Sequence, residues 1–267
     1  MSGPSETPAL FVPAGDDWLP TAHSRGPWSS DALHGGPVAA LLTRALEQVE
    51  APIPARLTRV TVELLRPVPL VPLRVTTEVV RPGAKVATLE ATLRRVDDGQ
   101  VLAMARAQRI RAVDLDFPDG ADDDVPALPD APSDLSHWPG SSEIAFHSTA
   151  AEHRIVSGEF GRPGPVMDWV RLRVPVVPDE APTGWQRAVA VADFTNGLSA
   201  VVPFDGTSMF INPDLTVHLW REPVGEWIGT EALTRTSSTG IGTSDATLFD
   251  RSGRIGRGMQ SLLLERR

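Results

Sequence analysis

Three short stretches of the chain carry residue types that could polarise a carbonyl group or activate a water molecule, and the first is His34-Gly35-Gly36. It stands directly before Pro37 and an apolar stretch typical of a helix. Free N–H groups at a helix start are good donors to a carbonyl oxygen, and glycines let a ligand approach them closely. Such donors would stabilise the negative charge that develops on a carbonyl oxygen during hydrolysis. The simpler interpretation is a tight turn beside a locally packed histidine.

The second stretch is a carboxylate inside an apolar segment that is expected to be helical. Asp193 lies in Ala188-Val189-Ala190-Val191-Ala192-Asp193-Phe194. A carboxylate among apolar residues is costly unless it is hydrogen-bonded, and buried charged groups gather at functional sites. An ionised carboxylate could activate water as a general base. The alternative is that Asp193 faces solvent or bonds Asn196 locally.

The third stretch is a glutamine near the end of the chain. Strand alternation places Gly256, Gly258 and Gln260 on one face, so the two glycines leave room beside the amide. A glutamine amide can orient a water molecule or donate to an oxyanion. The alternative is an ordinary polar residue on a strand.

Composition narrows the function classes. The 267 residues, 41% hydrophobic and 22% charged, have the balance of a soluble globular protein of one large or two ordinary domains. A net charge of −9 disfavours nucleic acid as a partner, and the lack of cysteine excludes disulfides and thiolate chemistry. The six histidines show no spacing typical of a metal site, and no Gly-x-Ser-x-Gly elbow occurs. No apolar run is long enough for a membrane span and no secretory signal is evident, so we expect a cytoplasmic protein.

Hydrophobic periodicity predicts the elements that would position these residues. Apolar residues recur with helical spacing in 37–49, and a second apolar run predicts a helix over 187–202. Alternating or β-branched segments predict strands at 57–65, 70–80, 86–96, 101–110, 146–159, 169–176, 215–220, 227–236, 242–249 and 255–264. The Asp/Pro-rich segment 114–140 predicts a linker that is mobile or extended. The pattern favours an α+β fold with antiparallel sheets.

The second half of the chain repeats the first. The segment 61–67 resembles 216–223, and 93–101 resembles 247–255, in the same order and with similar spacing. We therefore expect an N-terminal repeat over 1–113, the linker over 114–140 and a C-terminal repeat over 141–267. The alternative is that any two antiparallel hairpins look alike.

These residues resemble a known family. The segments 32–42, 212–219, 221–227 and 250–261 are similar to the thioesterase-like superfamily related to bacterial acyl-CoA thioesterase II. The resemblance covers nearly the whole chain except 114–140. It implies a double hotdog fold, in which two long helices are each wrapped by a curved antiparallel sheet. It also implies acyl-CoA substrates, a place in lipid metabolism, and no metal or other cofactor.

The resemblance further implies a water-activating triad of Asp, Thr and Gln. Asp193 matches the aspartate and Gln260 matches the glutamine. The expected place of the threonine is held by Asn212 or Pro213, and Asn212 could position water through its amide. Thr216 is nearby but would have to be aimed correctly by its strand.

The prediction is therefore an acyl-CoA thioesterase with Asp193, Gln260 and Asn212 as catalytic residues and His34-Gly35-Gly36 as the substrate-binding segment. The alternative is a hotdog protein that binds acyl ligands without turnover, since the threonine is missing. A hotdog hydratase is disfavoured, because Asp31 lies only three residues before His34 with no asparagine between them. Sheet edges in double hotdog proteins often pair, so a homodimer is a further expectation.

Overall fold

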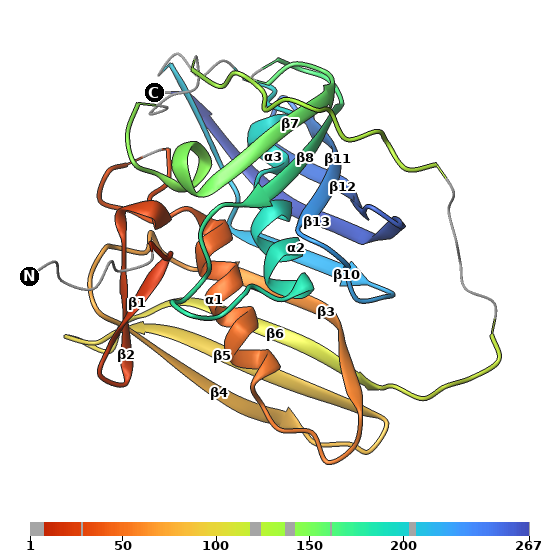
Figure 1. Cartoon of the computed structure of the whole chain (residues 1–267). Helices are drawn as coiled ribbons and strands as arrows, with labels where there is room; N and C mark the ends of the chain where they lie inside the picture. Colours follow the sequence, from red (N-terminus) through yellow and green to blue (C-terminus); the bar gives the residue numbers. More distant parts are fainter. Residues whose placement is uncertain are drawn as a thin grey trace, which may run out of the picture.

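Two helices lie side by side at the centre of the molecule, and one long curved sheet wraps around them (Figure 1). The computed structural model describes residues 8–27, 29–117, 124–136, 142–160, 162–202 and 207–266. The first half contains β1 (Phe11–Ala14), β2 (Asp17–Pro20), η1 (Ala22–Ser24), α1 (Gly35–Glu47), β3 (Ala55–Leu64), β4 (Leu73–Arg81), β5 (Val86–Arg95) and β6 (Val101–Arg111). The second half contains η2 (Phe146–Ala150), β7 (Ala151–Ser157), β8 (Val166–Leu172), α2 (Gly184–Ala192), α3 (Thr195–Leu198), β9 (Ser208–Ile211), β10 (Asp214–Leu219), β11 (Trp227–Thr236), β12 (Ile241–Asp250) and β13 (Gly253–Arg266).

The two halves share one sheet, and its central seam carries the repeat seen in the sequence. The strand order is β1-β2-β4-β5-β6-β3-β10-β13-β12-β11-β8-β7, with β9 paired to β13. At the seam β3 and β10 run antiparallel with Thr61 opposite Thr216, and their hydroxyl oxygens lie 3.2 Å apart. These two threonines begin the repeated segments. An antiparallel pair centred on equivalent residues relates the two halves by a local twofold axis, as expected for a duplicated unit.

The first predicted helix is present but starts earlier. α1 begins at Gly35 with His34 as its N-cap and ends at Glu47, two residues before the expected end. Its apolar stripe, with Val38, Leu41 and Leu46 at most 1% exposed, packs into a core that continues into the second half. The helical period was therefore a sound guide to the buried face but not to the ends.

The second predicted helix, 187–202, is wrong at both ends. α2 starts at Gly184, where the Thr183 side chain accepts a hydrogen bond from the Gln186 N–H at 3.1 Å. It stops at Ala192, and the following four-residue α3 is a separate turn. The break falls at Asp193, the C-cap of α2. Asp193 therefore lies at a helix end and not inside an apolar helix.

Two predicted strands also differ from the structure. The first part of 146–159 is the π-helical turn η2, in which the Thr149 and Ala150 N–H groups donate to the Ala145 oxygen and so are not available to a sheet. Two hydroxyls of the turn also donate to preceding carbonyls. Thr149 Oγ1 donates to the Ala145 oxygen at 2.9 Å, and Ser148 Oγ donates to the Glu143 oxygen at 2.7 Å. The strand expected over 169–176 is β8, shifted toward the N-terminus. The short strands β1, β2 and β9 were not predicted.

Part of the expected linker covers a sheet edge. Ser133 donates its N–H to the His153 oxygen at 2.8 Å and accepts the Ile155 N–H on Oγ at 2.7 Å, so residues 124–136 run along β7. Arg154 donates to the Pro129 and Asp130 oxygens of the same segment. The segment is extended but held, and residues 118–123 and 137–141 lie outside the described part of the chain.

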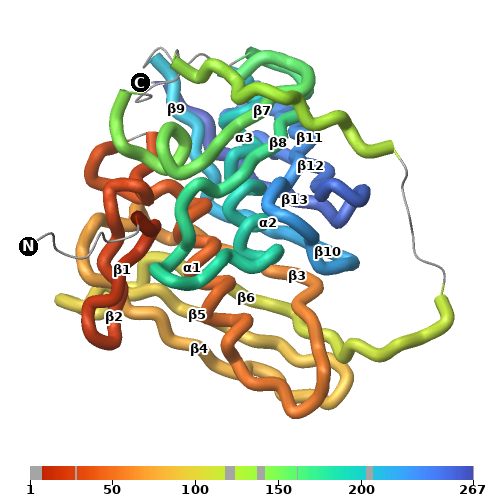
Figure 2. The backbone as a smooth tube through the Cα atoms, viewed as in Figure 1, coloured from red at the N-terminus to blue at the C-terminus, as the bar shows by residue number. Residues whose placement is uncertain are grey.

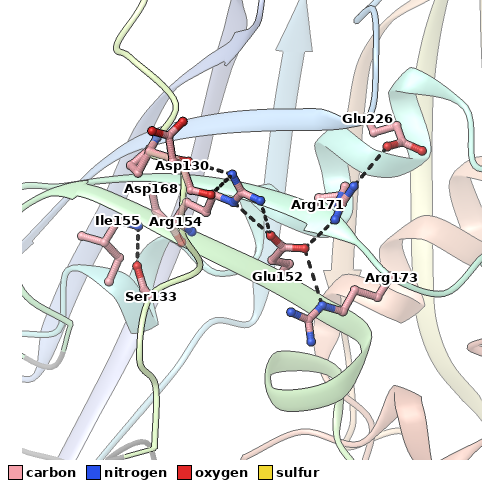
Figure 3. Close-up of polar contacts among 10 residues, drawn as sticks. Asp130, Ser133, Glu152, Arg154, Ile155, Asp168, Arg171, Arg173 and Glu226 are labelled. Carbon is pink, nitrogen blue, oxygen red and sulfur yellow. Dashed lines mark hydrogen bonds and ion pairs between the residues drawn. The ribbon is translucent and has the colours of Figure 1, made fainter.

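A charged cluster on β7 and β8 fixes this edge. Figure 3 shows Glu152 between Arg154 and the two arginines Arg171 and Arg173, with Glu226 beyond Arg171. Burial opposes the charge of Glu152, but the hydrogen bonds from Arg171 and Arg154 outweigh it and lower its pKa. The carboxylate therefore stays ionised and holds Arg154, the arginine that binds the covering segment.

The other end of the sheet also contacts the same chain. The Leu10 and Phe11 N–H groups donate to the Pro175 and Val176 oxygens, both at 2.9 Å, so the N-terminal strand joins the second half (Figure 2). Both outer edges are thus partly paired internally. A homodimer remains a prediction, and less of the sheet edge is free to pair with a second copy of the chain. In the part of the chain described, no helix is both long and apolar enough to cross a membrane.

Candidate active site

A cavity of about 520 Å³ opens where the start of α1 meets the end of α2. Both halves line it. The first half supplies Gly26, Pro27, Ser29, Ala32, Leu33, His34, Gly35, Val38 and residues 64–68, and the second supplies His147, Phe160, Asp193, Phe194, Asn196, Gly197, Met209 and residues 211–213. Most of these side chains are apolar, and a few polar groups converge at one point. This is the composition of a pocket for an apolar ligand with one reactive group.

Asp193 is the centre of the polar groups. Its side chain is 3% exposed. Asn212 Nδ2 donates to Asp193 Oδ1 at 2.8 Å, and His34 Nδ1 lies 2.7 Å from Asp193 Oδ2. Gln260 Nε2 lies 3.4 Å from Oδ1 and 3.3 Å from the Asp193 backbone oxygen. The buried carboxylate thus has donors on both oxygens, which offset the cost of its desolvation.

The contact between His34 and Asp193 fixes the tautomer of the imidazole. Nδ1 also lies 3.2 Å from the Gly36 nitrogen, which could donate to it. One nitrogen cannot accept from Gly36 and donate to Asp193 at the same time. The shorter, charge-assisted contact places the proton on Nδ1, donated to the carboxylate.

Aromatic rings hold the His34 imidazole. Phe146 and Phe194 stack with an angle of 2° between their planes, and the His34 ring centroid lies 5.1 Å from the first and 4.9 Å from the second. The His153 ring packs against Phe194 in a T-shaped arrangement, with 4.8 Å between the ring centroids. Packing on several sides leaves the imidazole little freedom to rotate.

The two glycines after His34 have different surroundings. A Cβ atom at Gly35 would lie 2.8 Å from both oxygens of Asp193, so the carboxylate occupies the space that a side chain would take. A Cβ atom at Gly36 would lie 2.7 Å from the Ala190 oxygen and 2.9 Å from the Phe146 ring. Gly35 lines the cavity, whereas Gly36 does not. The expectation that Gly36 contacts substrate therefore finds no support in its position, because its place is taken up by packing against α2.

Gln260 lies behind Asp193. As alternation predicted, it shares the buried face of β13 with Gly256 and Gly258, and it is 0% exposed. A Cβ at Gly258 would lie 3.3 Å from that of Ala192, so the glycine admits the end of α2. Gln260 does not line the cavity. From this position its amide lies beside Asp193 and can hold the carboxylate in place.

Asn212 and not Thr216 faces the carboxylate. Asn212 lies between β9 and β10, lines the cavity, and accepts a hydrogen bond on Oδ1 from Asn196 Nδ2 at 3.2 Å. Asn196 therefore supports Asn212, and the local bond to Asp193 considered from the sequence is not made. Thr216 instead faces Thr61 across the seam.

Three features of this site were not predicted from the sequence. The pair formed by His34 and Asp193, the aromatic packing of Phe194, and the support from Asn196 all depend on contacts between the halves or on the break after α2. The signal available was the segment Asp193-Phe194-Thr195-Asn196, where polar and aromatic residues follow a pure Ala/Val run. In the described residues, no group of three or more acidic or histidine side chains is arranged to hold a metal ion.

A second, smaller cavity of about 320 Å³ lies at the opposite end of the helix pair. Here Glu47, the last residue of α1, accepts hydrogen bonds from Thr183 Oγ1 and from Gln186 Nε2, both at 2.8 Å. Glu222 lines the same cavity. Burial raises the pKa of both glutamates, and Glu222 adds to the rise at Glu47 by repulsion.

The fold and the cavity between its halves define a double hotdog protein. A protein from Thermobifida fusca assigned as a thioesterase II is similar over 98% of this chain and 100% of its own, with 17% identity and a TM-score of 0.71. An acyl-CoA thioesterase II, TesB2, from Mycobacterium marinum is similar over 94% of both chains, with 17% identity and a TM-score of 0.67. A protein of unknown function with a hot dog fold from Alicyclobacillus acidocaldarius is similar over 96% of both chains, with 16% identity and a TM-score of 0.68. At these identities the similarity shows the fold.

The family follows from the sequence models. A model described as the acyl-CoA thioesterase N-terminal domain matches residues 24–110, and one described as the acyl-CoA thioesterase C-terminal domain matches residues 122–264. The second alone covers more than half of the chain, so the protein belongs to the acyl-CoA thioesterase family. No curated protein sequence matches the chain.

Proposed function

We propose that this protein hydrolyses the thioester of a fatty or related acyl-CoA, with water activated at the group of residues around Asp193. The observation that carries the proposal is the buried Asp193 carboxylate, which lines an otherwise apolar cavity and is held there by donors from both halves. An apolar acyl chain suits the cavity wall, and the reactive thioester would lie at its polar point. Family membership supports the reaction class.

The surrounding groups support the same reaction. Gly35, the first residue of α1, lines the cavity, and the free N–H groups of a helix start would stabilise a developing oxyanion there. Asn212 presents an amide beside the carboxylate. The exposed Arg66 on the cavity lining supplies a cation for the phosphate groups of CoA.

Asp193 supports hydrolysis in either of two ways. The carboxylate takes a proton from water itself, as the sequence suggested, or it orients the His34 imidazole that does so. Removal of the carboxylate abolishes the activity in both cases. The D193A variant therefore tests the function. It does not distinguish which atom accepts the proton, and a separate experiment addresses that question.

The experiment measures free thiol released from acyl-CoAs of increasing chain length. We expect turnover by the wild type and a loss of about 10³- to 10⁴-fold in D193A. Thermal unfolding checks that the variant is folded, and D245A, which removes a surface carboxylate paired with Arg235, should keep full activity. Unchanged turnover in D193A would contradict the proposal.

A second candidate is an acyl-ligand-binding protein without turnover. Asn212, at the place where the family resemblance leads one to expect a threonine, favours it. Thermal shifts with the same acyl-CoAs separate the two functions. Stabilisation of the wild type by an acyl-CoA, with no release of thiol from any member of the panel, would favour the binding protein.

A further inference from the structure

The proton of the His34–Asp193 contact leaves the other imidazole nitrogen as an acceptor. With Nδ1–H donated to Asp193 Oδ2 at 2.7 Å, Nε2 carries a lone pair. Within the described part of the chain, no hydrogen bond is made to Nε2, and His34 lines the cavity. Such a nitrogen can act as a base once a water molecule and a substrate lie next to it in the cavity.

The oxygens of Asp193 are engaged differently. Oδ2 faces His34, and Oδ1 accepts from Asn212 at 2.8 Å, with Gln260 at 3.4 Å behind it. A buried carboxylate with donors on both oxygens is placed to orient its partners. A buried carboxylate that holds one imidazole nitrogen while the other faces the substrate is the arrangement that makes histidine a general base in hydrolases.

We propose that His34 is the general base of the hydrolysis and that Asp193 is the residue that positions it. This inference rests on the proposed thioester hydrolysis and names its proton acceptor. His34 comes from the first half and Asp193 from the second, so the catalytic pair exists only because the two halves are fused across the β3–β10 seam.

In this reaction His34 carries one proton from water to the leaving thiolate. The water oxygen forms a bond to the thioester carbonyl carbon while His34 Nε2 takes one water proton, which gives a tetrahedral oxyanion facing the start of α1. The oxyanion re-forms the carbonyl and breaks the carbon–sulfur bond. The thiolate of CoA takes the proton from Nε2, so the products are a carboxylic acid and free CoA, and the imidazole returns to its neutral form.

The pH dependence of the wild type provides a test that needs no variant. An imidazole base and a carboxylate base differ because their reference pKa values are about 6.5 and 3.9. We expect kcat/KM for acyl-CoA to rise with pH through the imidazole range. Besides Asp193, the titratable groups lining the cavity are His147 and Arg66, so the assignment to His34 needs variants as well.

The variants H34A and H34Q test whether the rise of kcat/KM in the imidazole range is due to His34. Each should lower kcat by about 10²- to 10⁴-fold, and the limb of the pH profile in the imidazole range should disappear. Free imidazole should restore part of the rate in H34A, since the vacated space adjoins the cavity. The matched control is H218Q, because His218 is exposed on β10 and does not line the cavity.

The outcomes are separable. No thiol release by the wild type would end the proposed function itself. Thiol release with a pH profile that rises only in the carboxylate range, or with full activity in H34Q, would overturn the role of His34 alone. Loss of activity in H34A with an unchanged pH profile and no rescue by imidazole would show that His34 merely positions Asp193, and this too would overturn the inference.

Discussion

The two ends of the α1–α2 helix pair have the same architecture and different chemistry. At the Asp193 end, where α2 stops beside the start of α1, the N-cap His34 contacts the carboxylate of the other helix. At the Glu47 end, α1 stops beside the start of α2. There the hydroxyl of the N-cap Thr183 donates a hydrogen bond to the Glu47 carboxylate. The fold therefore offers two equivalent places for a carboxylate at a helix start.

The difference lies in what surrounds each carboxylate. The Asp193 end opens into a largely apolar cavity and carries an imidazole, which can take and return a proton. The Glu47 end opens into a smaller cavity lined by Arg56, Arg109 and Glu222, and its hydroxyl cannot act as a base at neutral pH. Arg109 also donates to the Val49 oxygen at 2.6 Å just after α1, so this end stabilises a helix terminus. Duplication gave two sites, and the residue types predict chemistry at one and structural support at the other.

Among the changes that compare the two ends, the largest effect is expected from the glycines that start the two helices. G35A would place a methyl group 2.8 Å from both oxygens of Asp193, so the carboxylate must move. We expect kcat/KM to fall about 100-fold with little change in Tm, since a small displacement of a catalytic group is enough.

The matched variant is G184A at the other end. Its Cβ would lie 2.6 Å from the Pro223 oxygen, which is backbone and cannot turn away. We expect a loss of about 1–3 kcal/mol in stability and unchanged turnover per folded molecule. If G35A kept full activity, or if G184A lost turnover while folded, the division of roles between the ends would be wrong.

The comparison also shows which parts of the site the sequence could predict. Alternation around Gly256, Gly258 and Gln260 was enough to place the glutamine on the buried face. The repeated segments that begin at Thr61 and Thr216 were enough to predict a duplicated α+β fold, because local periodicity and duplication are properties of the chain itself.

What could not be predicted depends on contacts between the halves. The position of the Asp193 carboxylate at the end of α2 depends on contacts with Asn212 and His34, which are distant in sequence. Periodicity in the Ala/Val run gave no signal for that break. Alternation likewise could not show that Gln260 lies behind the carboxylate and outside the cavity, because that depends on where α2 meets β13. The short strands β1, β2 and β9 carry too few residues for a pattern.

A moderate effect is expected at the N-cap of the Glu47 end. T183A removes the acceptor for the Gln186 N–H and a donor to Glu47. We expect a loss of about 1 kcal/mol in the free energy of unfolding, as for other caps, with activity unchanged. T183S keeps the hydroxyl and should recover most of the loss. Chemical denaturation of the three proteins measures it, and a drop in turnover of folded T183A would mean that this end takes part in the reaction.

The smallest expected effect is the pH dependence of stability at Glu47. Burial raises the pKa of Glu47 above its usual range, so the folded state binds its proton more tightly than the unfolded state does. Stability therefore falls as pH rises from the usual glutamate range toward the raised value. E47Q keeps an acceptor for Thr183 but carries no charge, so we expect it to gain on the wild type over that window, by about 1 kcal/mol or less.

Glu180 provides a control with the opposite sign. Arg44 donates to its carboxylate at 2.6 and 2.8 Å and lowers the pKa of Glu180. The ionised form is favoured in the folded state, so that contribution is present above the usual glutamate range and is lost as pH falls through the lowered pKa. Denaturant unfolding of E47Q and E180Q across this range should give differences from the wild type that slope in opposite directions. Parallel slopes would mean that Glu47 is not held in an unfavourable charged state, and the contrast between a chemical and a structural carboxylate would then rest on the Asp193 end alone.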